Sequence, residues 1–141
     1  MKQMKRDQYL DMDEWTFDQS PEGWRGFPRS TKQKIKLIED YIRYKRPTEL
    51  LNTLYWHIGQ LAAFKGDYKQ AIKNMKLAIT NEDRHWDTYV RLTIKFIEND
   101  REGFNSILQH ATLDDNPNKT FINKLINGFD KSYHEAYSQP E

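Results

Sequence analysis

Apolar residues recur every three or four positions along most of the chain, which is the spacing of one face of an α-helix. The first run follows Ser30 or Thr31, either of which can cap a helix N-terminus. Its apolar positions are Ile35, Ile38, Tyr41 and Ile42. A second run has Pro47 in its first turn and stops at Gly66, which can take the left-handed conformation that ends helices. Its apolar positions are Leu50, Leu51, Leu54, Tyr55, Ile58, Leu61 and Ala62.

A third helix is expected after Asp67, whose side chain can cap it, with Gln70 placed to complete a capping box. Its inner stripe is Tyr68, Ala71, Ile72, Met75 and Ile79. Residues 80–85 are polar and predict a loop.

Three more apolar stripes continue the pattern over residues 86–97, 104–111 and 121–129. The last is preceded by Asn116 as a cap and Pro117 at the first helical position. Ser132 and Glu135 are spaced to cap a short final turn. Because no run of alternating apolar residues predicts a strand, the expected fold class is all-α, with short connections that make consecutive helices antiparallel.

Residues 15–27 do not follow this pattern. They combine Trp15, Phe17, Trp24 and Phe27 with Pro21, Gly23 and Gly26, and neither a helical nor a strand period fits them. We interpret 1–29 as an aromatic N-terminal arm, 30–130 as the helical domain and 131–141 as a C-terminal tail. We expect Trp24 and Phe27 to anchor the arm on the first helices and Trp15 and Phe17 to be held less firmly. The sharper alternative is that the arm is a built-in ligand occupying a groove.

Residues 52–85 resemble a tetratricopeptide repeat, a helical hairpin of about 34 residues. The positions that match are Tyr55, Ile58, Gly59, the turn at Gly66, Asp67 and Tyr68, and the small residues Ala71 and Ala78. Asp83 departs from the family, which favours proline there, and Met75 stands where an aromatic is usual. Residues 86–112 form a degenerate second repeat. The resemblance implies a short right-handed stack of antiparallel helical hairpins, in which Gly59 and Ala71 let two helices cross closely and Ala78 admits the next unit.

The same resemblance implies that the first helix of each hairpin lines a concave peptide groove. The positions that match the groove are Thr53, Trp56, His57, Gln60, Phe64 and Arg91. An aromatic ring, an amide and a guanidinium are suited to gripping a peptide backbone and a carboxylate. The family's strongest carboxylate-binding pattern needs further basic residues and is not matched. The alternative is that Trp56 and His57 are packed in a closed groove.

Composition narrows the class of protein. The 141 residues suit a single domain, and 13% aromatics argue against disorder despite only 37% hydrophobic residues. There is no cysteine, and no apolar run approaches the roughly 20 residues of a membrane span. We therefore expect a cytoplasmic protein without a membrane partner; its oligomeric state stays open.

The net charge of +1 hides a basic middle, since residues 25–79 carry twelve basic and four acidic side chains. Lys65, Lys69, Lys73 and Lys76 share a helical face, but no aromatic residues interleave there as base-stacking platforms. Nucleic acid is therefore not the expected partner, and its association through the 25–79 region is kept as an alternative.

Candidate chemistry is sparse. The histidines at 57, 85, 110 and 134 are never three or four residues apart, so no helical metal pair is expected. No glycine-rich phosphate loop or nucleophile elbow is found, and an enzyme site around His57 is a second alternative. The sequence favours a non-catalytic adaptor or small chaperone that binds a protein or peptide, with no cofactor, metal or catalytic residue.

Overall fold

The computed structural model describes residues 5–139, and within that range it is helical and contains no strand. This confirms the predicted all-α class. The helices are α1 (Arg6–Leu10), α2 (Glu14–Gln19), the 3-10 turn η1 (Trp24–Gly26), α3 (Thr31–Lys45), α4 (Leu51–Phe64), α5 (Tyr68–Leu77), α6 (Arg84–Ile97), α7 (Arg101–His110), α8 (Lys119–Asn127) and α9 (Tyr133–Tyr137).

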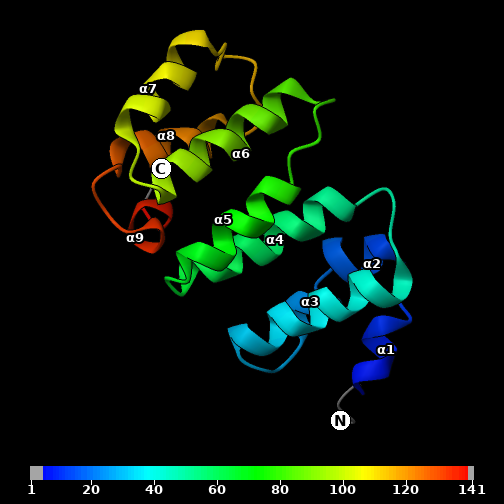
Figure 1. The fold of residues 1–141 in the computed structure, drawn as a ribbon. Helices are drawn as coiled ribbons and strands as arrows, with labels where there is room; N and C mark the ends of the chain where they lie inside the picture. Colours follow the sequence, from blue (N-terminus) through cyan, green and yellow to red (C-terminus); the bar gives the residue numbers. More distant parts are fainter. Residues whose placement is uncertain (1–4, 140–141) are drawn as a thin grey trace.

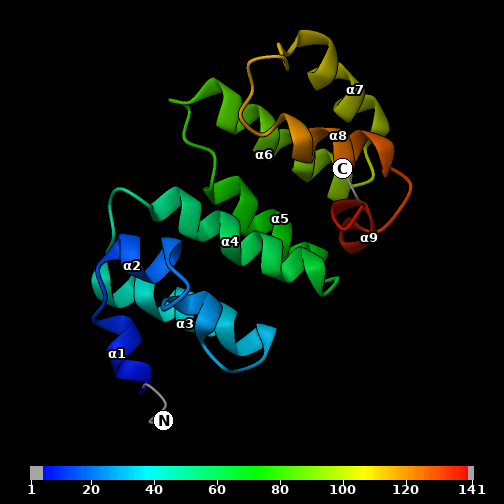
Figure 2. The same ribbon diagram turned by 180° about the vertical axis from the view of Figure 1, so that it is seen from behind.

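The α4–α5 hairpin lies in the middle of the molecule (Figure 1). Helices α1, α2 and α3 lie on one side of it, and α6 to α9 lie on the other, as the view from behind also shows (Figure 2). Each helix from α3 to α6 contacts the next one along the chain, and α9 returns to pack on α4 and α8. Helix α4 is therefore a hub that touches both halves.

The hairpin forms as its glycines predict. Gly66 adopts φ +84° in the turn, and the Asp67 carboxylate accepts a hydrogen bond from the backbone N–H of Gln70, 3.3 Å away. Gly59 lies so close to α5 that a β-carbon there would be 2.7 Å from Cγ of Met75. Ala71 and Ala78 are fully buried. The close helix crossing is thus present, whereas the tetratricopeptide relationship and the handed stack stay predictions.

Local capping signals place several helix ends correctly. Ser30 and Gln33 form a capping box at α3, and Ser132 and Glu135 form one at α9. Asp100 caps α7 by accepting from the N–H of Gly103. In each case the interaction joins residues close in sequence, which is why the sequence alone predicts it.

Two helices begin later than predicted. Helix α4 begins at Leu51, not near Pro47, because the N–H of Leu50 donates to the Glu14 carboxylate of α2 at 2.6 Å. Helix α8 begins at Lys119, not Pro117. Asn116 is buried and shapes the preceding turn, accepting from the N–H of Asn118 and donating to the carbonyl of His85 on the neighbouring helix.

The N-terminal arm is more ordered than its sequence indicates. We expected no regular structure over residues 15–27, but α2 and η1 occupy most of it. Asp13 caps α2 through the N–H of Thr16, and the Tyr41 hydroxyl donates to the carbonyl of Met12. These hydrogen bonds join the arm to itself and to α3.

The expected anchoring of the arm is wrong for Phe17. Its ring is fully buried and stacked on Tyr41, with the ring centroids 3.8 Å apart. Trp24 is buried and Phe27 half-buried, as expected, while Trp15 is 54% exposed. Phe17 is a main anchor because the turn of α2 directs it to the side opposite Trp15.

The segment called a C-terminal tail carries a core element. Within it, α9 buries Tyr133 and Ala136 completely. The backbone N–H of Tyr133 donates to the Tyr68 hydroxyl of α5, 3.1 Å away. Residues 140 and 141 of that tail lie outside the described residues.

Candidate functional site

The predicted groove residue Trp56 is packed inside the molecule. It is 3% exposed, and its ring lies against Trp86 and Tyr89 of α6, with centroid separations of 5.5 and 4.9 Å. The Trp86 indole N–H in turn donates to the carbonyl of Ala78, 2.9 Å away. Trp56 thus links the hairpin to α6 and offers little surface to a partner.

His57 lies beneath the N-terminal arm. Its Nδ1 is 2.7 Å from Oδ1 of Asp18, a fully buried carboxylate of α2 that also accepts from the indole N–H of Trp24 at 2.9 Å. The guanidinium of Arg25 approaches Nε2 of His57 at 3.3 Å. A carboxylate only accepts and a guanidinium only donates, so both contacts are satisfied by a neutral ring with its proton on Nδ1.

Several influences act on the Asp18 carboxyl. Burial opposes its ionisation and is the largest single influence. Hydrogen bonds from His57, Trp24 and Gln19 lower its pKa, and the pKa of Asp18 lies below its ordinary value. Asp18 therefore holds the arm on α4 as an ionised acceptor.

An aspartate that orients a histidine also occurs in catalytic triads, where Nε2 of the imidazole is directed at a nucleophile. Here, among the described residues, the side-chain hydrogen bonds of His57 go to Asp18 and Arg25, and Arg25 occupies the Nε2 side. This geometry fastens the arm and supplies no activated hydroxyl.

Gln60 and Phe64 lie at the other end of α4, under α9. The amide of Gln60 donates to the Tyr133 hydroxyl at 3.1 Å. The ring of Phe64 packs against Tyr133 and Tyr137, with centroids 5.2 and 5.4 Å apart. Both predicted groove positions are thus partly covered by the chain's own C-terminal helix.

The remaining two positions lie apart from these. Thr53 is half-buried near the start of α4, and Arg91 is exposed on α6, where it donates to the side chain of Asn81 at 3.4 Å. The six predicted residues are therefore distributed among contacts with the arm, α6, α9 and the 81–91 surface. The structure does not bring them together on one open face.

A different groove is open between α3 and α5, over α4. Two adjoining hollows of about 670 and 380 Å³ meet at Glu39, which lines both. One end lies between Ser30 and Gln70, and the other between Arg43 and Leu77, so the two helices run in the same direction along the groove. The α3 residues that line it span about 20 Å at 1.5 Å per residue. The three helices are visible side by side in Figure 1.

The floor of this α3–α5 groove is apolar. Ile35 and Ile58 lie buried beneath it, and Tyr55 is half-buried. Leu77 stands at the rim and is 48% exposed. An apolar floor between two helices is the form of site that accepts one face of an amphipathic segment.

The rim of the α3–α5 groove is mainly basic. Its acidic side chains are Glu39 and Asp67. Its basic side chains are Lys32, Lys36, Arg43, Lys65 and Lys73. Because five basic side chains line the groove and two acidic ones do, the groove presents an excess of positive charge.

Asp40, beside the groove, gathers part of this charge. Lys36 and Arg43 approach its Oδ1 at 3.1 and 3.2 Å, and Arg6 of α1 pairs with its other oxygen. Burial opposes ionisation most strongly, but the hydrogen bonds and charges of Arg6 and Lys36 together lower the pKa of Asp40. One carboxylate cannot neutralise three cations, and the local positive excess persists.

The sequence contained a partial signal for this groove. Leu77 lies outside the predicted inner stripe of its helix, and Lys65 and Lys73 belong to the lysine face noted from spacing alone. What the sequence could not indicate is that α3 and α5 run in the same direction on either side of α4. That arrangement depends on how three helices pack.

Among the described residues, no group of three or more histidine or acidic side chains is arranged to hold a metal ion. Nor is any helix of the described chain both long enough and apolar enough to cross a membrane. None of the protein-family models, curated proteins or solved structures compared with the chain matches it.

Proposed function

We propose that the protein is a non-catalytic binding domain, of the adaptor or small-chaperone kind, whose α3–α5 groove accepts an acidic amphipathic segment of a partner protein. The observation that carries this proposal is the combination of an apolar floor with a basic rim. Apolar side chains spaced three or four apart on the partner would cover Tyr55 and Leu77. Carboxylates beside them would face the lysines of the rim.

The proposed binding surface differs from the residues matched to a tetratricopeptide groove. Trp56 and His57 hold the fold together, and a partner would reach them only by displacing α6 or the arm. The α3–α5 groove is open without such a change. Binding there leaves the Asp18–His57 contact in place.

The test is the binding of a fluorescently labelled model peptide, measured by anisotropy. The peptide has about 14 residues, so that as a helix it spans roughly 20 Å, with leucines on one face and glutamates elsewhere. The matched control peptide replaces every glutamate by lysine. We expect the acidic peptide to bind at least about tenfold more tightly, with an affinity that falls as salt rises.

Two pairs of variants locate the site. Leu77→Ser is expected to weaken the acidic peptide about tenfold, whereas Ile126→Ser, which alters an exposed apolar residue on α8, should not. Lys73→Glu should weaken it, whereas Lys69→Glu changes the charge of the same helix outside the groove. Equal binding of both peptides, or equal effects within both pairs, would refute the proposal.

A further inference from the structure

A third hollow lies next to the α3–α5 groove, where the arm meets α3, and Gln33 and Lys36 line both it and the groove. Its volume is about 530 Å³, within the range of small-molecule sites. It is lined by Lys5, Arg6, Phe27, Pro28, Arg29, Gln33 and Lys36. Four of these side chains are cationic and none is acidic. We refer to this hollow as the arm pocket.

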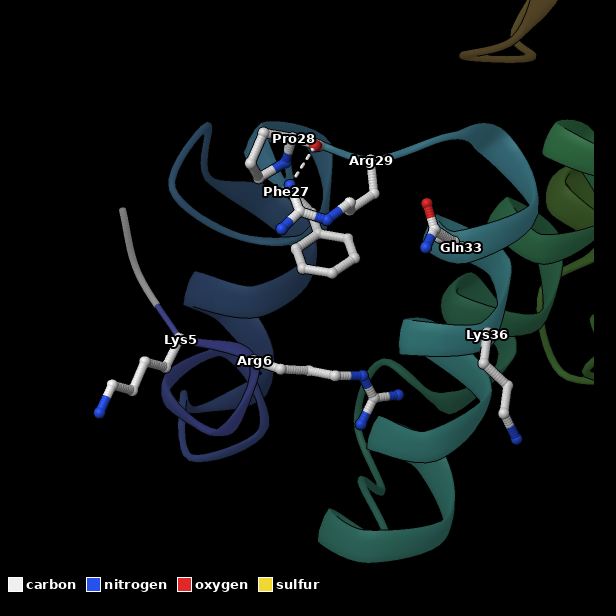
Figure 3. A pocket seen from close by; sticks show the side chains of 7 residues that line it. All are labelled: Lys5, Arg6, Phe27, Pro28, Arg29, Gln33 and Lys36. Atoms are coloured by element: carbon white, nitrogen blue, oxygen red, sulfur yellow. Dashed lines mark hydrogen bonds between the residues drawn. The ribbon is translucent and has the colours of Figure 1, made fainter. Parts of the chain in front are cut away.

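Figure 3 shows how these side chains are arranged. Arg6 extends from α1 toward α3, and the Phe27 ring lies between the two helices. Gln33 and Lys36 project from α3, while Lys5 points away from the others. The pocket therefore has hydrogen-bond donors from two sides and an aromatic wall.

The donors have unused capacity. Arg29 donates from one nitrogen to the carbonyl of Pro28 at 2.8 Å and keeps the rest of its five N–H groups. The Gln33 oxygen is used by Ser30 in the capping box, which leaves its amide nitrogen available as a donor. Arg6 and Lys36 are both paired with Asp40, and these two cations share that one carboxylate.

The aromatic wall distinguishes this pocket from a patch of surface lysines. Phe27 is half-buried, and its ring is held by an edge-to-face contact with Tyr9, with the centroids 5.1 Å apart. Pro28 extends the apolar wall. A bare inorganic anion would use the cations but would leave this wall uncovered.

From these observations we infer that the arm pocket binds a small organic phosphate that carries a planar ring. Guanidinium groups match phosphate oxygens in pairs, and an aromatic wall suits the flat face of a ring. A mononucleotide has both parts and a suitable size. The arm pocket shares Gln33 and Lys36 with the α3–α5 groove, but Arg29 and Phe27 line the pocket alone, so variants of these two residues test it separately.

The experiment is a calorimetric titration of the full chain at low salt with adenosine 5′-monophosphate. Adenosine and inorganic phosphate are the matched partial ligands. We expect the monophosphate to bind at least about tenfold more tightly than either, and to lose affinity as salt screens the cations. Adenosine binding equally well would overturn the role of the cations, and inorganic phosphate binding equally well would overturn that of the ring.

Variants assign the binding to the pocket. Arg29→Ala should weaken the monophosphate about tenfold, since Arg29 is exposed and bonds only to a neighbouring carbonyl among the described contacts. Gln33→Glu keeps an oxygen for the capping box but replaces the amide donor by a carboxylate, and it should also weaken binding. Arg43→Ala removes the same charge from the other side of Asp40 and should change the affinity less than about twofold.

Two further results separate this inference from its alternatives. If Arg29→Ala and Arg43→Ala weaken the monophosphate equally, the effect is one of net charge and the pocket is not the site. If a single-stranded oligonucleotide binds far more tightly than the monophosphate and both variants weaken it, an extended nucleic-acid surface replaces the proposed pocket. The acidic-peptide assay should be unchanged in Arg29→Ala, so failure of one proposal does not imply failure of the other.

Discussion

The contact between Gly59 and Met75 shows how one missing side chain sets the distance between two helices. A β-carbon at position 59 would lie 2.7 Å from Cγ of Met75 and 3.1 Å from the carbonyl oxygen of Ala71. The methionine side chain can move, but the carbonyl belongs to the backbone of α5. The short distance between α4 and α5 at this point is therefore fixed by the backbones of both helices.

We predict that Gly59→Leu lowers the free energy of unfolding by about 1–3 kcal/mol or more, because overpacking a tight crossing forces α4 and α5 apart. Chemical denaturation measures the loss. In a Met75→Ala background the penalty for Gly59→Ala should be smaller, since one of the two close atoms is gone. Unchanged stability of Gly59→Leu would show that the hairpin is looser than the structure indicates.

Asp18 is the residue through which the arm is held on α4. Oδ1 accepts from both His57 and Trp24, and Oδ2 accepts from Gln19 at 2.5 Å. Asparagine has one carbonyl oxygen, and its amide would confront another donor. We predict that Asp18→Asn lowers the free energy of unfolding by about 1–3 kcal/mol at neutral pH.

The pH dependence of this difference has a defined sign. The pKa of Asp18 is lowered in the folded protein, so ionised Asp18 stabilises the fold above its unfolded value of 3.8. That contribution is lost as the pH falls through the lower, folded value. The difference in the free energy of unfolding between the wild type and Asp18→Asn, measured by urea denaturation, should stay constant down to about pH 4 and become smaller below it. A difference that grows on acidification would contradict this assignment.

At the scale of elements, α2 shows how a short helix can sort two neighbouring aromatic residues. Phe17 is fully buried against Tyr41, whereas Trp15 is 54% exposed and its indole N–H donates to Glu49 at 3.2 Å. We predict that Phe17→Ala lowers the free energy of unfolding by about 3–5 kcal/mol, and that Trp15→Ala lowers it by less than about 1 kcal/mol. Thermal melts of the two variants provide the comparison, and equal losses would mean that α2 does not pack as described.

The length of a helix decides whether the sequence alone predicts it. Helices α3 and α5 were predicted because apolar spacing and caps such as Ser30 and Asp67 act within a few residues. Helices α1 and α2 have 5 and 6 residues, too few for a period to be recognised. The burial of Phe17 depends on Tyr41, which lies on another helix.

The candidate site divides in the same way. The close approach at Gly59 was predicted from a local match, and it is present. The sequence left open whether Trp56 and His57 line an open groove or are packed in a closed one, and they are packed. Pattern alone could not decide this, because Asp18 and Trp86, which cover them, come from other helices. The α3–α5 groove likewise depends on the packing of three helices.

For the whole molecule, α4 connects the two halves. His57 contacts the arm, Trp56 contacts α6, and Gln60 and Phe64 contact α9. Because α4 contacts both halves of the molecule, the stability of each half depends on the other. Loss of either covering segment should therefore weaken more than the segment itself.

The C-terminal helix provides the sharpest test of this dependence. Tyr133 and Ala136 of α9 are fully buried, and Tyr137 packs on Phe64 and Phe121. Fully burying a large apolar side chain contributes about 1.5–3 kcal/mol, so buried Tyr133 and half-buried Tyr137 together account for roughly 2–4 kcal/mol. A domain of this size is stable by only about 5–15 kcal/mol in total.

We predict that deleting residues 131–141 leaves a marginally stable protein with a much lower melting temperature. Fast hydrogen exchange should then spread from Phe64 and Gln60 toward the N-terminal end of α4, because α9 no longer covers the C-terminal end of that helix. Tyr133→Phe is the matched control: it keeps the buried ring and loses only the hydroxyl that accepts from Gln60, a cost of about 0.5–1.5 kcal/mol. If the deletion instead melts like the full chain, α9 is an appendage, and the two halves do not depend on α4 in the way its contacts imply.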